Sequence, residues 1–191
     1  MGTLKINNQE IFTETAGVIS IGTSFPTGHV IQIKYFSTDT AVTSTNSSSS
    51  SESWVDVLTS ANITMSSQSN KIMVCAVGSA AGDSHIYDFS WRLMRNIGGG
   101  SYSAIGGNTD PSDLMLSTNV LISGIGSGES GTTLSNNFLD TPNTTQEIIY
   151  KLQLMSGEGS TVYANRGHST NNARGWANTG DTSLTLMEIQ Q

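Results

Sequence analysis

The chain has 191 residues, a net charge of −7, and charged side chains at only 12% of its positions. An acidic chain without clusters of Lys and Arg does not suit a nucleic-acid phosphate backbone or an anionic membrane surface. Cys75 is the single cysteine, which excludes a disulfide framework and a cysteine-based metal site.

The composition favours an all-β fold. Ser and Thr together make up roughly a quarter of the chain, which is well above ordinary usage. Ala, Leu, Glu, Lys and Arg, the residues that build long helices, are comparatively scarce. Short β-branched runs are separated by Gly, Ser and Asn. We therefore expect a jelly-roll-like antiparallel β-sandwich with roughly eight to ten strands.

Residues 1–26 are expected to form an N-terminal arm, and residues 27–191 the sandwich domain. The arm contains two short apolar pieces, 4–6 and 18–21, which flank polar residues. This much chain cannot bury a core of its own, so the arm is either loose or edge-docked, or becomes ordered against a partner subunit or larger particle. Its candidate contact residues are Leu4, Ile6, Ile11, Phe12, Val18, Ile19 and Ile21.

Alternation of apolar and polar residues predicts the strands of the sandwich. The polar tract 38–53 is expected to be a surface loop, because it is dominated by Ser and Thr and has no means of forming a core. The nearly continuous apolar run 71–77 is typical of a central strand, in which Cys75 would be a small buried side chain. The predicted strands cover residues 28–36, 54–58, 63–65, 71–77, 86–95, 102–105, 114–116, 120–122 and 184–189.

The clearest local pattern lies at residues 146–166. Its first half alternates strictly, with the side chains of Ile148, Tyr150, Leu152 and Leu154 predicted to lie on one face. The loop 156–159 contains two glycines, and a second β-rich run follows at 161–166. This order of strand, glycine loop and strand predicts a β-hairpin.

No motif in the chain predicts a catalytic site. Residues 126–131 match the glycine spacing of a dinucleotide-binding loop, but no helix pattern follows them to receive a pyrophosphate. No G-x-S-x-G elbow supports a serine nucleophile. An enzyme that cleaves polysaccharides would need a paired acid and base, and no such pair stands out. We therefore expect a protein that is not an enzyme.

Candidate metal ligands are also dispersed. The histidines are His29, His85 and His168, and none has a second histidine at a spacing that forms a local zinc site. The aspartates predicted to lie in loops are Asp110, Asp113 and Asp140. They belong to no calcium-loop motif, so we expect solvated surface at these positions, and neither a metal nor a cofactor.

The polar loop 167–181 is the candidate binding site. Its candidate residues are Asn171, Asn172, Arg174, Trp176 and Asn178. An aromatic ring beside amides suits a carbohydrate, because the ring stacks on apolar sugar faces while the amides bond the hydroxyls. Trp and Arg are equally suited to a subunit contact. A plain loop that buries its own Trp is the third interpretation.

Several short pieces, taken in order, resemble a known family. They are GHVIQI, WVDV, SNKIMV, WRLMR, VYANR and LTLMEI. This ordered set, which extends over about residues 28–190, resembles a domain of virion fibre proteins of tailed bacteriophages, especially phages of marine bacteria and cyanobacteria. The resemblance implies a jelly-roll-like sandwich that assembles as a homotrimer on a virion, built in the host cytoplasm and released by lysis.

Two functions from different classes follow from the resemblance. The first is a structural virion protein, either a short fibre or a capsid-surface decoration, whose arm 1–26 attaches it to capsid or tail proteins or to sister subunits. The second is a host-attachment module whose loop 167–181 binds cell-surface polysaccharide. The first 12 residues contain no apolar core of a secretory signal, which agrees with release by lysis.

Overall fold

The computed structural model describes residues 2–6, 8–21, 27–46, 53–82, 89–106, 130–156, 160–167 and 180–191. These residues form fourteen strands and no helix. Accordingly, no helix in the described part of the chain could cross a membrane. The strands are β1 Gly2–Ile6, β2 Gln9–Thr15, β3 Val18–Ile21, β4 Val30–Thr38, β5 Val42–Asn46, β6 Trp54–Thr59, β7 Ile63–Thr64, β8 Lys71–Gly82, β9 Phe89–Ile97, β10 Ser103–Ile105, β11 Ser130–Asp140, β12 Glu147–Ser156, β13 Ser160–Ala164 and β14 Thr182–Ile189.

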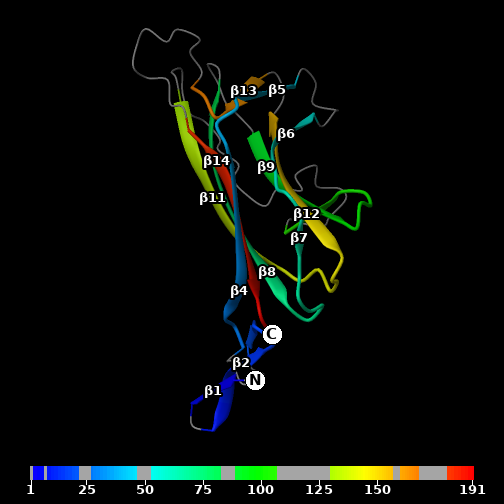
Figure 1. The fold of residues 1–191 in the computed structure, drawn as a ribbon. Helices are drawn as coiled ribbons and strands as arrows, with labels where there is room; N and C mark the ends of the chain where they lie inside the picture. The colour runs from blue at the N-terminus through cyan, green and yellow to red at the C-terminus, as the bar shows by residue number, and fades with distance from the viewer. Residues whose placement is uncertain are drawn as a thin grey trace.

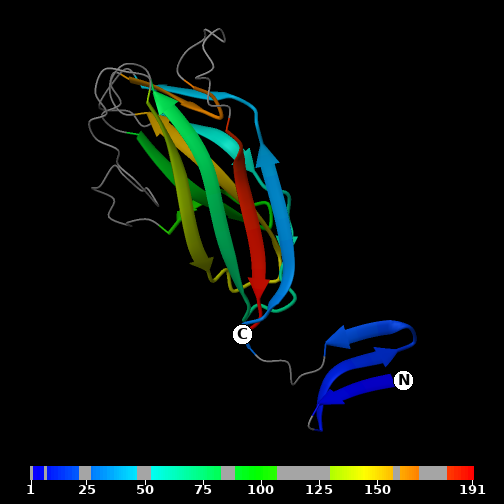
Figure 2. The same cartoon turned by 90° about the vertical axis from the view of Figure 1, so that its left-hand side faces the viewer.

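Eleven of these strands form two antiparallel sheets that pack face to face (Figures 1 and 2). The six-stranded sheet contains β4, β14, β8 and β11 side by side, with β13 and β5 continuing from the far end of β8. The five-stranded sheet has the order β10, β9, β12 and β6, with β7 also paired to β12. The pairing is nested along the sequence. The outermost strands of the domain, β4 and β14, pair with each other. Moving inward along the chain, β6 and β7 pair with β12, β8 pairs with β11, and β9 pairs with β10. This nested pairing over two sheets is a jelly roll, as predicted.

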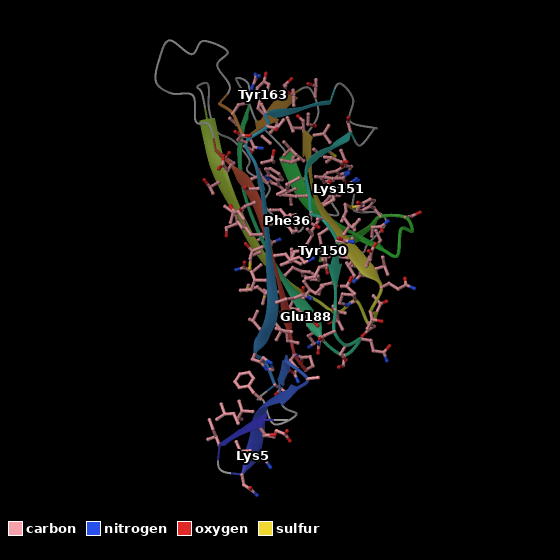
Figure 3. The ribbon with its side chains drawn as sticks, viewed as in Figure 1. Lys5, Phe36, Tyr150, Lys151, Tyr163 and Glu188 are labelled. Carbon is pink, nitrogen blue, oxygen red and sulfur yellow. The ribbon has the colours of Figure 1, made fainter. Side chains whose placement is uncertain are left out.

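The core lies between the two sheets and is built by alternation along the strands. The four residues predicted to share one face of β12 are all buried, and so are Trp91 and Leu93 of β9. Figure 3 shows Tyr150 of β12 between the sheets. The Trp91 ring fits against Gly78 of β8, because a Cβ at that position would lie 3.2 Å from the ring carbon Cη2. Glycine at this point therefore lets the largest core side chain lie close to the facing sheet.

The predicted hairpin at 146–166 is wrong. Both of its strands exist as β12 and β13, but they do not pair with each other. β12 pairs with β6, β7 and β9 in one sheet, whereas β13 pairs with β5 and β8 in the other. The two strands instead face each other across the core, to which β13 contributes the buried Val162 and Ala164. Strict alternation is satisfied equally well by a sheet neighbour or by a strand in the opposite sheet.

Three further predictions are corrected. The tract 38–53 is not only loop, because it contains β5, which pairs with β13 through residues 42–46. β11 covers Ser130–Asp140, where no strand was predicted, and it begins within the glycine motif 126–131. Cys75 lies on the outward side of β8 and is half-buried, because Ile72, Val74 and Ala76 take the inward positions. The predicted strands 114–116 and 120–122 lie outside the described residues.

Residues 2–21 form a separate three-stranded antiparallel sheet, here called the N-terminal sheet. Its strands β1, β2 and β3 pair only with one another. β2 and β3 are joined by the two-residue turn Ala16-Gly17, in which both residues have positive φ, at 55° and 83°. This is the conformation of a type I′ turn, which matches the twist of a tight hairpin. Figure 2 shows the N-terminal sheet beyond the end of the sandwich at which the C-terminus lies.

Candidate functional site

The candidate loop 167–181 is largely outside the described part of the structure. Asn171, Asn172, Arg174, Trp176 and Asn178 all belong to the segment 168–179, which is not described. Their role in binding a glycan or a subunit therefore stays a prediction.

The candidate metal ligands fall into two groups. His85, His168, Asp110 and Asp113 lie outside the described residues. Among the residues that are described, no group of three or more His, Cys, Asp or Glu side chains could hold a metal ion. Asp140, predicted to be solvated, is instead almost completely buried at the end of β11. The loop prediction failed because the polar residues before Asp140 form a long strand.

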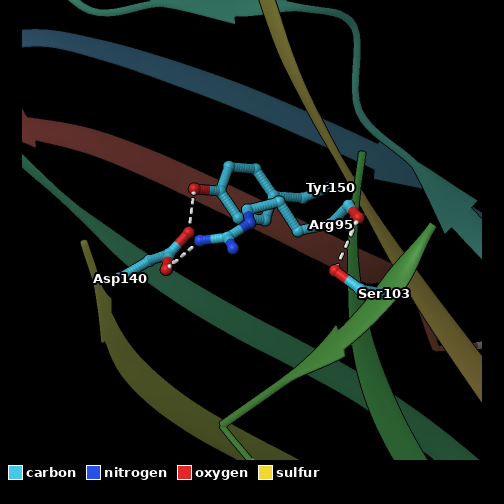
Figure 4. Close-up of polar contacts among 4 residues, drawn as sticks. All are labelled: Arg95, Ser103, Asp140 and Tyr150. Atoms are coloured by element: carbon cyan, nitrogen blue, oxygen red, sulfur yellow. Dashed lines mark hydrogen bonds and ion pairs between the residues drawn. The ribbon is translucent and has the colours of Figure 1, made fainter. Parts of the chain in front are cut away.

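Asp140 connects the two sheets (Figure 4). One carboxylate oxygen accepts a hydrogen bond from Nη1 of Arg95 at 2.6 Å, and the other accepts from the Tyr150 hydroxyl at 2.7 Å. Arg95 and Tyr150 lie directly opposite each other on β9 and β12 of the five-stranded sheet, whereas Asp140 comes from the six-stranded sheet. Burial and the adjacent Asp140 charge raise the pKa of Tyr150, so its hydroxyl stays protonated and donates. The cluster is a structural link.

Glu188 forms a second buried polar cluster. This residue of β14 is fully buried, and Figure 3 shows it near the lower end of the sandwich. Its carboxylate accepts hydrogen bonds from the Gln32 amide at 2.6 Å, the Asn70 amide at 2.6 Å, and the backbone N–H and hydroxyl of Ser66, both at 2.8 Å. Burial raises the pKa of Glu188, but these donors outweigh burial and bring the pKa below its ordinary value.

The Glu188 cluster predicts a loss of stability in acid. Because the pKa of Glu188 is lower in the folded chain, its contribution is fully present above the ordinary pKa of about 4.3 and disappears as the pH falls through the folded pKa. We expect Glu188→Gln to lower the free energy of unfolding by about 1–3 kcal/mol at pH 7, and the difference from the unsubstituted chain to shrink steadily below about pH 4.

Urea unfolding at several pH values measures this difference. Asp56→Asn is the control, because the Asp56 side chain is half exposed and its ion pair with Lys151 is screened by solvent. The two chains differ in free energy of unfolding, and this difference should depend on pH. If it stayed the same between pH 7 and pH 3, the lowered pKa of Glu188 would be contradicted.

The outer face of the five-stranded sheet is covered by charged side chains that bind one another. Gln153 lies directly opposite both Arg92 and Asp56; its amide oxygen accepts from Arg92 Nε, and its amide nitrogen donates to Asp56, each at 2.6 Å. Lys151 forms an ion pair with Asp56 at 2.8 Å. The Arg92 guanidinium also stacks over the Trp54 ring, 4.1 Å from its centroid. Charged, hydrogen-bonded surface of this kind is typical of a face exposed to water.

The outer face of the six-stranded sheet is different. Four apolar residues lie directly opposite one another across four strands: Ile33 of β4, Met187 of β14, Met73 of β8 and Leu139 of β11. The next row is Tyr35, Thr185, Cys75 and Asn137, and the third is Ser37, Ser183, Val77 and Ser135. No residue in these three rows is charged. We call this surface the apolar outer face.

Exposure makes the apolar outer face unusual. Ile33 is 62% exposed and Tyr35 63%, while Leu139 and Val77 are 43% and 40% exposed. Isolated apolar side chains are common on protein surfaces, but a contiguous group on one face of a sheet indicates an interaction site. The two outer faces of one sandwich therefore have opposite character: one carries its own polar network, and the other presents apolar side chains to solvent.

The N-terminal sheet also exposes apolar side chains. Leu4 and Ile6 lie two positions apart on β1 and so share a face, and Phe12 of β2 lies directly opposite Leu4. They are 56%, 59% and 36% exposed. Ile21 of β3 is opposite Phe12 in the backbone register. Three of the predicted arm residues are thereby brought together on one face of a sheet.

Sequence reasoning did not identify the apolar outer face, although one signal was present. Strands buried on both faces have nearly continuous apolar runs, whereas strands with one wet face alternate. Residues 71–77 are such a run, yet only the inward side of β8 is covered by the described chain. The unexplained half of that run is Met73, Cys75 and Val77.

Comparisons with known proteins give only distant likenesses. No protein-family model and no curated protein matches the sequence. Among solved structures, the chain is similar to VP2 of infectious bursal disease virus in a subviral particle, at 14% identity and a TM-score of 0.38, over 91% of this chain and 47% of that one. It is similar to T=1 particles derived from the same virus at 12% identity and a TM-score of 0.36, over 93% and 39% of the two chains. It is also similar to the structure of the Gx strain of this virus, at 10% identity and a TM-score of 0.36, over 85% of this chain and 37% of that one. The chain spans less than half the length of each of these proteins.

Proposed function

We propose that this chain is a non-enzymatic structural protein of a virus particle. In the more specific form of the proposal, the virus is a tailed bacteriophage and the chain forms a short homotrimeric fibre or a capsid-surface decoration. The N-terminal sheet takes part in attaching the chain to capsid or tail proteins or to sister subunits. The short sequence pieces that resemble phage fibre domains, in the same order along the chain, support the phage assignment. The jelly-roll topology agrees with the fold that this resemblance implies.

The observation that carries the proposal is the difference between the two outer faces. A protein that works alone in water has no need of the uncharged apolar rows that include Ile33, Met73 and Leu139. The cores of protein interfaces are depleted of charge and enriched in Met and aromatic residues, and this surface is uncharged and contains Met73, Met187 and Tyr35. Self-association of copies through the six-stranded sheet would cover it.

The two buried carboxylates also support a structural function. Asp140 of the six-stranded sheet binds Arg95 and Tyr150 of the five-stranded sheet, and Glu188 holds the segment around Ser66 and Asn70 against β14. Each carboxylate accepts several hydrogen bonds from the chain itself. Groups satisfied in this way stabilise a fold.

The mass of the purified chain in solution tests the proposal. We expect light scattering to give three times the 20.2 kDa of one chain. A stable monomer at concentrations well above micromolar would overturn a self-assembling fibre. Because a capsid-dependent subunit would also be monomeric, a monomer would direct the next experiment to mixtures with purified capsids.

A further inference from the structure

We propose that the N-terminal sheet of one copy packs on the apolar outer face of a second copy of the chain. This inference rests on the proposed self-assembly and names the surfaces that make it. The two surfaces lie in different parts of one chain, so the contact is heterologous, and each copy both gives and receives a sheet.

The first argument is that β8 has the sequence of a strand covered on both sides. Its inward residues Ile72, Val74 and Ala76 are buried in the core. The intervening residues Met73, Cys75 and Val77 are also apolar, but no second layer of the described chain covers them, and Val77 is 40% exposed. An apolar layer placed over this side would complete the pattern.

The second argument is that the N-terminal sheet has the shape and chemistry of such a layer. It is a three-stranded sheet with Leu4, Ile6 and Phe12 exposed on one face, and sheets pack face to face through side chains of this kind. Its three strands and the four strands of the apolar outer face present rows of comparable width, since neighbouring strands lie about 4.8 Å apart. In the structure it stands apart from its own sandwich (Figure 2).

The third argument is electrostatic. A chain with a net charge of −7 repels its own copies over most of its surface. The three rows of the apolar outer face have no charge, and the strand position just beyond them on β8 is the cation Lys71. The N-terminal sheet has one lysine, Lys5, and two glutamates, Glu10 and Glu14. The apolar outer face is neutral, with Lys71 beyond one end of its rows and Asp39 and Asp181 beyond the other, so it repels a slightly acidic sheet less than a charged face would.

Cys75 allows a direct test, because it is the single cysteine and lies in the second row of the apolar outer face. Full-length chains that carry Leu4→Cys together with Cys75→Ser are co-expressed with differently tagged chains that keep Cys75, and the purified mixture is oxidised. We expect a disulfide between the two kinds of chain. The matched control is Thr3→Cys with Cys75→Ser, because Thr3 is the next residue and lies on the opposite face of β1.

The outcomes separate the alternatives. A disulfide between chains that forms with Leu4→Cys, and about tenfold less with Thr3→Cys, supports the proposal. Equal crosslinking by both variants, or none by either, overturns it. So does a disulfide within one chain that carries both Leu4→Cys and Cys75, since the N-terminal sheet would then cover its own sandwich.

A second measurement needs no engineered cysteine. The rate at which a maleimide labels Cys75 is compared between the unsubstituted chain, Leu4→Glu and Thr3→Glu. We expect labelling of the Leu4→Glu chain to be about tenfold faster, because the charge removes the N-terminal sheet from the face, whereas Thr3→Glu has little effect. Equal labelling rates would overturn the proposal.

Light scattering on the same samples distinguishes this inference from the proposed function. A trimer with no crosslink means that copies associate through another surface, so the inference fails while the proposed function stands. A monomer means that this inference and the self-assembling fibre both fail, whereas a decoration protein that needs the capsid would remain.

Discussion

Replacing Asp140 with Ala is expected to lower the free energy of unfolding by about 3 kcal/mol. The substitution removes the acceptor of two hydrogen bonds at once and leaves the Arg95 guanidinium without its counter-charge. The Arg95 side chain is 20% exposed, so water reaches it in part, and the expected loss lies at the lower end of the range for a broken buried ion pair. The Tyr150 hydroxyl, which is buried, loses its acceptor as well.

Urea unfolding, followed by the fluorescence of the buried Trp91, measures this effect. All chains are compared at one protein concentration, because self-association adds to apparent stability. Tyr150→Phe is the matched control: it removes only the hydroxyl and its bond to Asp140, and should cost about 1 kcal/mol. If Asp140→Ala cost no more than Tyr150→Phe, the ion pair would contribute little and the link between the sheets would rest on packing.

Replacing Met73 with Glu is expected to abolish self-association while the chain still folds. Met73 lies at the centre of the four-residue row on the apolar outer face. A carboxylate there would be buried without a partner in every subunit contact, at a cost of about 3 kcal/mol for each contact. That cost corresponds to roughly hundredfold weaker association per contact. In a separate chain the same carboxylate would point to solvent, so the sandwich itself should be little affected.

Light scattering over a range of protein concentrations measures the change. Thr59→Glu is the control, because Thr59 is exposed on the five-stranded sheet and lies directly opposite Lys151. It adds the same charge to a face that is already charged, and should leave the mass unchanged. Unaltered assembly of the Met73→Glu chain would exclude the apolar outer face as a subunit contact. Dissociation by both variants would mean that net charge, and not this surface, controls association.

These predictions concern surfaces and links that local sequence patterns do not reveal. Asp140 lies three positions before a threonine- and asparagine-rich stretch and was predicted to be solvated. Its neighbours Arg95 and Tyr150 are distant in sequence, and only the pairing of β9 with β12, together with the packing of β11 over them, brings the three side chains together. A carboxylate that ends a polar strand looks the same in sequence whether its acceptor sites are filled by water or by protein.

The sequence by itself determined most strands of the sandwich, though not β5 or β11, and the direction of most of their side chains. Alternation has a period of two, so it places Tyr150 and Trp91 inside wherever their strands lie. Glycine-free apolar runs such as 71–77 identify the central strand for the same reason. The scarcity of helix-forming residues excluded other fold classes, and the all-β prediction was confirmed.

Only the tertiary structure decided which strand lies beside which. Alternation carries no information about the partner, so β12 and β13 read as a hairpin although they lie in opposite sheets. In a jelly roll the partners come from opposite ends of the domain, as β4 and β14 do. So much chain lies between two such strands that no local sequence pattern can indicate their pairing. The apolar outer face depends on that pairing, because Ile33, Met73 and Leu139 form one surface only when four strands from distant parts of the chain align in register.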